Sequence, residues 1–224
     1  MLSKKTKMLR LSALSLAVAG AMSFSHAASA EGVDVSGSVG VANMYLWRGY
    51  DLGNGNAAVS GSLQASYKGA YTGIWGSSGD VTNGTEVDFY AGYGTEYKGF
   101  SADLSVWNYY YPSVAPNQAN NEDDLGGLSE AVLSLGYAGL TATAYHNIAG
   151  GIGYNYYSLA YNYKAFTMLV GKHDNVGGAE DVTHVDLSYA YNDNLTFTLS
   201  QQVDNAAPGD SLKYVVSYSL PIGK

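Results

Sequence analysis

The chain has 224 residues, with 28 glycines, 21 tyrosines, four prolines and no cysteine, and only 13% of its residues are charged. The lack of cysteine excludes disulfides and thiolate metal sites, and the wealth of glycine and tyrosine suits many short strands better than a helical core. The formal net charge of −8 argues against nucleic acid and anionic lipid headgroups as partners, because both require a basic face.

The first 30 residues predict a cleaved signal peptide. A basic segment is followed by the apolar residues 11–22 and by Ala28, Ser29 and Ala30, so we expect cleavage between Ala30 and Glu31. Losing Lys4, Lys5, Lys7 and Arg10 takes the formal net charge from −8 to −12. No other segment approaches the roughly 20 consecutive apolar residues of a transmembrane helix, so a membrane could be crossed only by strands of a single domain over residues 31–224.

The rest of the chain alternates apolar and polar residues with the period of a β-strand. In residues 59–67, for example, Val59, Leu63 and Tyr67 lie on one face and Ser60 and Ser62 on the other. About twelve strands are predicted, over residues 35–47, 59–67, 71–77, 86–93, 100–109, 129–137, 140–146, 156–163, 166–173, 184–191, 195–200 and 212–219.

The connections between these strands fall into two alternating classes. Tight turns flanked by aromatic or large apolar residues occur at 67–71, 97–100, 137–140, 163–166 and 191–195, and longer polar loops at 48–56, 79–84, 111–128, 147–153, 174–181 and 203–210. This pattern predicts an up-and-down β-barrel of the outer membrane, with periplasmic turns, external loops and both termini periplasmic. A soluble β-sandwich also shows alternation, but its large residues would concentrate in mid-strand, whereas here aromatic residues gather at one end of successive strands.

Residues 37–78 contain two motifs of aromatic and small residues. Tyr45, Trp47, Arg48 and Gly49 form an aromatic-x-x-Arg-Gly end of the first strand, and Tyr71, Gly73 and Trp75 match a GxYxGxWxS-like third strand. With these motifs, the segment resembles the N-terminal signature of the TorF family of porins. Weaker resemblance at residues 86–93 and 184–200 extends it over essentially the whole mature chain. The resemblance implies a porin-like role in the outer membrane.

Strand parity places several charged side chains in the barrel interior. We expect Arg48 and Lys213 to form a basic wall on the neighbouring first and last strands. We expect an acidic wall opposite, formed by Glu86, Asp88, Asp103 and Glu130. Such walls would produce a transverse field that selects ions. The alternative is that Arg48 pairs with one or two of these carboxylates and holds a filled barrel together. A twelve-stranded barrel permits a narrow pore.

Two same-face pairs raise the possibility of an outer-membrane hydrolase. These are Glu86 with Asp88 and His184 with Asp186, and together they resemble the arrangement of omptin-like proteases. Polar lumen residues occur in any barrel, however, and the chain has no nucleophile motif, nucleotide-binding motif or metal-ligand spacing, so we expect neither an enzyme nor a cofactor. The acidic run at residues 117–124 contains oxygens that suit calcium but lacks the ligand spacing of an EF-hand, which favours a solvated loop.

The sequence therefore predicts a passive outer-membrane channel, surrounded by lipid, for small hydrophilic solutes or ions, with a mild preference for cations. The alternatives are a closed barrel with a structural or adhesive role and a surface hydrolase. The substrate and the choice between monomer and homo-oligomer stay open.

Overall fold

A computed structural model describes residues 32–112, 124–151, 153–175, 180–206 and 210–222. The predicted signal peptide with Ala30 and Glu31, and residues 117–123 of the acidic loop, lie outside these ranges. The described strands are β1 (Asp34–Ala42), β2 (Leu46–Trp47), β3 (Tyr50–Asp51), β4 (Ala58–Tyr67), β5 (Ala70–Asp80), β6 (Gly84–Tyr97), β7 (Phe100–Tyr110), β8 (Leu128–Tyr137), β9 (Leu140–Ala149), β10 (Asn155–Tyr163), β11 (Phe166–Asp174), β12 (Thr183–Ala190), β13 (Leu195–Asp204) and β14 (Lys213–Ile222).

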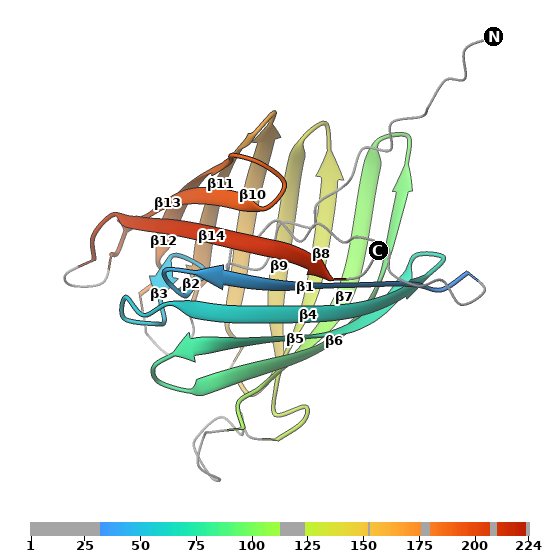
Figure 1. Cartoon of the computed structure of the whole chain (residues 1–224), viewed down its shortest axis with the longest axis horizontal. Helices are drawn as coiled ribbons and strands as arrows, with labels where there is room; N and C mark the ends of the chain where they lie inside the picture. The colour runs from blue at the N-terminus through green and yellow to red at the C-terminus, as the bar shows by residue number, and fades with distance from the viewer. Residues whose placement is uncertain (1–31, 113–123, 152, 176–179, 207–209, 223–224) are drawn as a thin grey trace.

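Twelve of these strands form a closed antiparallel barrel (Figure 1). Each strand pairs with its neighbours in sequence, and β1 pairs with both β4 and β14, which closes the ring. The predicted all-β, twelve-stranded, up-and-down barrel is therefore confirmed. The described part of the chain contains no helix with the length and apolar character that a membrane crossing needs.

The two faces of the barrel wall differ in chemistry because the strands alternate with period two. On β6, Phe89 and Tyr93 are exposed on the outside, whereas Glu86, Asp88 and Tyr90 are buried inside. On β14, Tyr214 and Tyr218 point outward and Lys213 points inward. An apolar outer face around a polar interior is the arrangement that a lipid environment requires of a barrel.

Three of the tight turns, at Lys68-Gly69, Lys98-Gly99 and Ala138-Gly139, have the backbone conformation of two-residue hairpin turns. Lys68 and Gly69 have φ angles of 49° and 90°, and Lys98 and Gly99 have φ angles of 51° and 82°. Two consecutive positive φ angles define a type I′ turn, which matches the right-handed twist of the strands. The aromatic residues beside the tight turns form an exposed rim of Tyr67, Tyr97, Phe100, Tyr137, Tyr163, Phe166 and Tyr191.

Tyr71 is an exception to the predicted aromatic rim. Its side chain lies on the inner face of β5, and its hydroxyl donates hydrogen bonds of 2.8 and 3.0 Å to the carboxylate of Asp103 on β7. The inner face can hold the ring because Gly92 lies beneath it, and a Cβ atom there would lie 2.5 Å from the Tyr71 hydroxyl.

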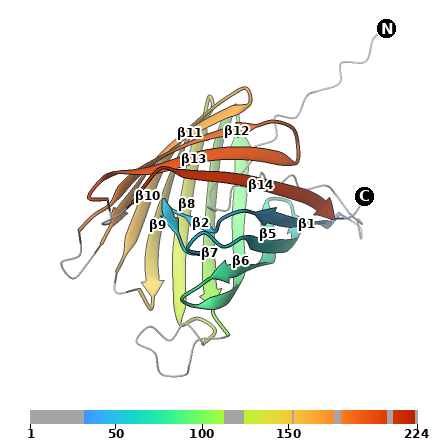
Figure 2. The same ribbon diagram turned by 60° about the vertical axis from the view of Figure 1, so that its left-hand side comes forward.

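The segment between β1 and β4 differs most from the sequence prediction. The first strand was expected to run to Trp47 and to be followed by an external loop over residues 48–56. It ends at Ala42, and β2 and β3 form a separate two-stranded hairpin. In both views this hairpin lies within the outline of the barrel (Figures 1 and 2). We call residues 43–57 the inserted hairpin.

The inserted hairpin fills the interior near the long loops. Tyr45 packs with Ala58, Trp75 and Tyr90 on one side, and Leu46 packs with Ala42 and Val215 on the other. Nearer the short turns the inner face carries mainly small hydroxyl side chains, which pair across strands as in Ser38 with Ser62, Ser134 with Thr143, and Ser188 with Thr198. The interior therefore has an aromatic, charged half and a half lined by small polar residues.

Candidate functional site

The tip of the inserted hairpin is a tight turn made by Arg48 and Gly49. Their φ angles are 47° and 84°, so Trp47 and Tyr50 pair across the same type of turn as that found at the short-turn end of the barrel. Gly49 lies against the wall, where a Cβ atom would lie 2.6 Å from Cγ of His184. Glycine is thus required both by the backbone and by the close approach to β12.

Arg48 reaches across the barrel and forms a buried ion pair with Glu130 on β8. Nη1 and Nη2 donate to the two carboxylate oxygens over 3.0 and 2.6 Å, and the Tyr109 hydroxyl donates to Glu130 over 2.7 Å. Bidentate geometry and extra hydrogen bonds are what a buried ion pair needs to offset its desolvation.

Aromatic rings surround the Arg48 guanidinium. Its Cζ atom lies 4.2 to 5.7 Å from the ring centroids of Trp47, Tyr145, Tyr154 and Tyr156. Rings at this distance attract a cation through their negative faces, and the attraction is stronger where water is excluded. Arg48 is 6% exposed, so the ion pair and the rings together fix the tip of the hairpin in the interior.

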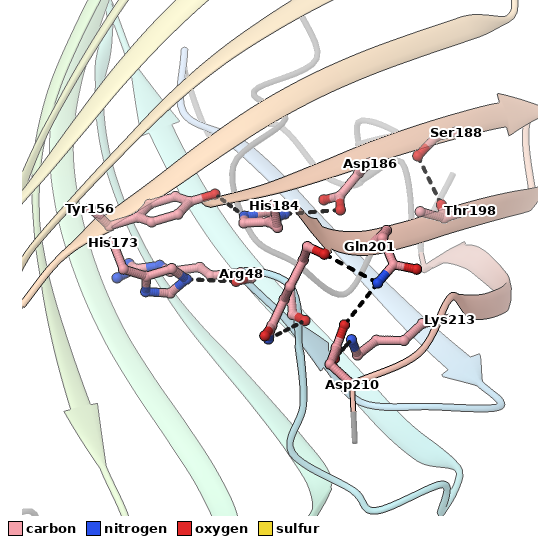
Figure 3. A network of polar contacts seen from close by, with 12 residues as sticks. Arg48, Tyr156, His173, His184, Asp186, Ser188, Thr198, Gln201, Asp210 and Lys213 are labelled. Carbon is pink, nitrogen blue, oxygen red and sulfur yellow. Dashed lines mark hydrogen bonds and ion pairs between the residues drawn. The ribbon is translucent and has the colours of Figure 1, made fainter. Parts of the chain in front are cut away.

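Two histidines hold the other side of the hairpin tip (Figure 3). Nε2 of His173 on β11 lies 2.7 Å from the carbonyl oxygen of Arg48, and its Nδ1 lies 2.7 Å from the Tyr154 hydroxyl. His184 on β12 lies between the Tyr156 hydroxyl, 2.8 Å from Nε2, and the carboxylate of Asp186, 3.0 Å from Nδ1. The Gln202 side chain donates to the Gly49 carbonyl over 3.2 Å.

The opposite side of the hairpin meets an acidic pair on β6. The Tyr45 hydroxyl donates to Glu86, and Asp88 is fully buried, with neither carboxylate oxygen bonded to a partner among the described residues. Burial, reinforced by the neighbouring Glu86, raises the pKa of Tyr45, so this phenol stays protonated and remains a donor. Burial and Glu86 likewise raise the pKa of Tyr111, beyond the end of β7.

The predicted basic wall is wrong. Arg48 does not stand on the first strand beside Lys213 but crosses to Glu130, which lies nearly opposite β1 in the strand order. Lys213 forms its ion pair with Asp210. Both cations are therefore neutralised locally, and the alternative of an internal Arg48 ion pair describes the geometry. Asp103 lies apart from this cluster, bonded to Tyr71.

The structure brings Glu86 and Asp88 together on one wall, and His184 and Asp186 on the wall opposite. His184 is fully buried between Tyr156 and Asp186, where it supports the hairpin. Within the described ranges, no three histidine or carboxylate side chains are grouped so that they could hold a metal ion.

Sequence reasoning missed the residues that receive the hairpin, namely Tyr109, Tyr145, Tyr154, Tyr156 and His173. One signal was available for its tip. Trp47-Arg48-Gly49-Tyr50 has the same aromatic-basic-glycine order as Tyr67-Lys68-Gly69 and Tyr97-Lys98-Gly99, which form the tight turns. That order predicts a tight turn at Arg48 in place of an open loop.

Comparison with known proteins identifies a family for the chain. The model of the family described as "Bacterial protein of unknown function (Gcw_chp)" matches residues 25–206. The search of curated proteins found no match.

Several solved structures are similar to the barrel. Outer membrane phospholipase A from Escherichia coli is 9% identical, with a TM-score of 0.42 over 82% of this chain and 95% of that protein. Pseudomonas aeruginosa OccK5 (OpdH) is 10% identical, with a TM-score of 0.40 over 86% of this chain and 68% of that protein. Pseudomonas aeruginosa OprD is 11% identical, with a TM-score of 0.36 over 89% and 69% of the two chains. We base no functional argument on these likenesses, whereas the family match covers most of the sequence, and the chain belongs to the Gcw_chp family.

Proposed function

We propose that this protein is an outer-membrane channel for passive diffusion of small hydrophilic solutes or ions, and that the inserted hairpin forms its narrowest part. Three features support the proposal: the exposed apolar outer face, the hydroxyl-lined half of the interior, and the resemblance to the TorF family of porins. Lipid is then the partner around the barrel, and the solutes are its cargo.

The balance of charge beside the hairpin carries the proposed preference for cations. Arg48 is paired with Glu130 and Lys213 with Asp210, so among the described residues no basic side chain is ion-paired with the acidic pair Glu86 and Asp88. Negative charge at a constriction favours permeation by cations. We propose no enzymatic role, because His184 is buried between its two partners.

Reversal potentials in planar bilayers test this proposal. Replacing Glu86 by Gln together with Asp88 by Asn should move the reversal potential towards anion selectivity. The wild-type preference should weaken at high salt, because screening shortens the field. Glu96→Gln is a matched control, since Glu96 shares the strand and the face of Glu86 but is exposed at the short-turn end, so it should change selectivity far less.

The competing function is a closed barrel with a structural or adhesive role, and the inserted hairpin is the observation that favours it. Arg48→Ala separates the two functions. In a channel it should raise cation selectivity and leave conductance present, because it removes a positive charge from the constriction. If the purified, folded wild-type protein conducts under no condition, or if Arg48→Ala alone opens a closed barrel, the proposal of a passive channel fails.

A further inference from the structure

Hydrogen bonds around the hairpin tip form a closed circuit that fixes the protonation state of one histidine. Arg48 Nη1 donates to the Tyr154 hydroxyl over 3.2 Å, Tyr154 Oη contacts His173 Nδ1, and His173 Nε2 contacts the Arg48 carbonyl oxygen. A carbonyl oxygen can only accept, so Nε2 of His173 carries a hydrogen. Nδ1 then accepts from the Tyr154 hydroxyl, which is the arrangement of a neutral imidazole.

Tyr154 is a dependable donor in this circuit. Burial raises its pKa to about 12, so its hydroxyl keeps its proton throughout the acid and neutral range. The circuit therefore runs in one direction, from the Arg48 side chain through Tyr154 and His173 back to the Arg48 backbone.

A second proton on His173 would break this circuit. Nδ1 would become a donor aimed at the Tyr154 oxygen, which already accepts from Arg48, and the phenol hydrogen would lose its acceptor. Two cations, Arg48 and His173, would then both lie within hydrogen-bond distance of the Tyr154 hydroxyl oxygen. Like charges so close in a buried site repel strongly.

The groups around His173 offer little compensation for a new positive charge. Its ring contacts Trp47 and Tyr50 from the hairpin, Tyr154 and Tyr156 from the β10 side, and His184 from β12. Three of these rings already face Arg48. Among the nearby carboxylates, Glu130 is engaged by Arg48, Asp186 is hydrogen-bonded to His184, and Asp181 of the loop before β12 is ion-paired with Lys172.

His184 is different, although it is equally buried in the same wall. Its Nδ1 faces the carboxylate of Asp186, and its Nε2 faces a hydroxyl that can turn to accept. With a hydrogen on both ring nitrogens, His184 would keep both partners, because Asp186 can accept from Nδ1 and the Tyr156 hydroxyl oxygen can accept from Nε2. The two histidines thus form a natural comparison, in which only His173 loses partners on protonation.

We propose that protonation of His173 releases the inserted hairpin from the β10–β12 wall and opens the barrel interior in acid. The part of this inference that concerns conductance rests on the proposed channel function, whereas release of the hairpin does not. Acid would therefore act as a regulator of the channel.

Two readouts test the inference, one of hairpin position and one of conductance. The chain has three tryptophans, and Trp47 is the one on the inserted hairpin. Protein labelled with fluorotryptophan, folded in detergent micelles, is titrated from about pH 8 to about pH 3, a range that begins above the ordinary histidine pKa and extends well below it. The ¹⁹F resonance of Trp47 is assigned with Trp47→Phe. Conductance is recorded over the same pH range.

In the wild-type protein we expect the Trp47 resonance to shift in one protonation step and conductance to rise severalfold with it. His173→Gln, whose amide stays neutral and can both donate and accept, should abolish both responses. His184→Gln is the matched control and should retain them. Should His173→Gln not fold, His173→Asn replaces it.

The outcomes separate the two proposals. An acid response of Trp47 that survives in His173→Gln, or that is lost equally in His184→Gln, overturns the role of His173. A His173-dependent response of Trp47 without conductance at any pH supports hairpin release and overturns the channel. Conductance with no response of Trp47 supports the channel and overturns hairpin release.

Discussion

Single residues decide whether the hairpin can lie inside the barrel. Gly49 meets two demands at once, since its φ of 84° disfavours any side chain and a Cβ atom there would clash with His184. Gly55, on the same segment, has a similar φ of 79°, but no atom lies within 4 Å of the position that its Cβ would take. Comparing Gly49 with Gly55 therefore separates the effect of backbone strain from the effect of close contact with the barrel wall.

Alanine at these two glycines should therefore have unequal effects. Gly55→Ala should lower the free energy of unfolding by about 1 to 2 kcal/mol, the cost of a left-handed alanine. Gly49→Ala adds a clash with a buried histidine, so we expect about 2 to 4 kcal/mol. Urea unfolding of the purified barrel measures both changes, and equal losses would show that the contact with His184 contributes nothing.

At the scale of elements, the sequence predicts strands well and the hairpin poorly. The strand faces follow from a local period of two, so Leu63 and Phe89 on the outside and Glu86 and Asp88 on the inside could be assigned from their immediate neighbours. The position of Arg48 depends on Glu130, 82 residues further along the chain. A local sequence pattern cannot reveal a contact between residues so far apart in the chain. For this reason the sequence predicts Arg48 on a wall of the barrel and not across its interior.

The lipid face of β4 provides a test of strand register. Leu63 is 55% exposed on the outside, and its neighbour Ser62 points inward, where its hydroxyl lies 2.8 Å from that of Ser38. Leu63→Arg should cost roughly 2 to 4 kcal/mol of stability in a bilayer, because it places a charge in hydrocarbon. Ser62→Arg should cost much less. Urea unfolding in lipid vesicles measures both changes. Equal losses of stability would show that the face of β4 that carries Leu63 does not face lipid as proposed.

At the scale of the whole molecule, the alternation of turns and loops indicates an orientation. The described short turns and the exposed aromatic rim lie at one end of the barrel, and the inserted hairpin lies at the other. The closed ring was predictable, since twelve alternating segments joined in turn by tight turns and longer loops leave few other arrangements. The contents of the ring were not predictable, because the wall sequence alone does not say which loop enters the interior.

The orientation can be tested with single cysteines, since the chain has none of its own. Leu125→Cys lies at the long-loop end, where Leu125 is 73% exposed, and Asp193→Cys lies in an exposed short turn. If the short turns face the periplasm, a membrane-impermeant maleimide should label Leu125→Cys on intact cells and should label Asp193→Cys only after lysis. Reversed labelling would contradict this orientation.

The route of the inserted hairpin also constrains the order of assembly. The hairpin directly follows β1, yet the groups that hold its tip come from β8 and from the segment running from Tyr154 to β13, all of which occur later in the chain. Contacts between such distant segments require loop closure before they contribute stability, so they form late in folding. The hairpin can be secured only after most of the opposite wall exists, which makes its insertion a late step that follows the growth of the ring.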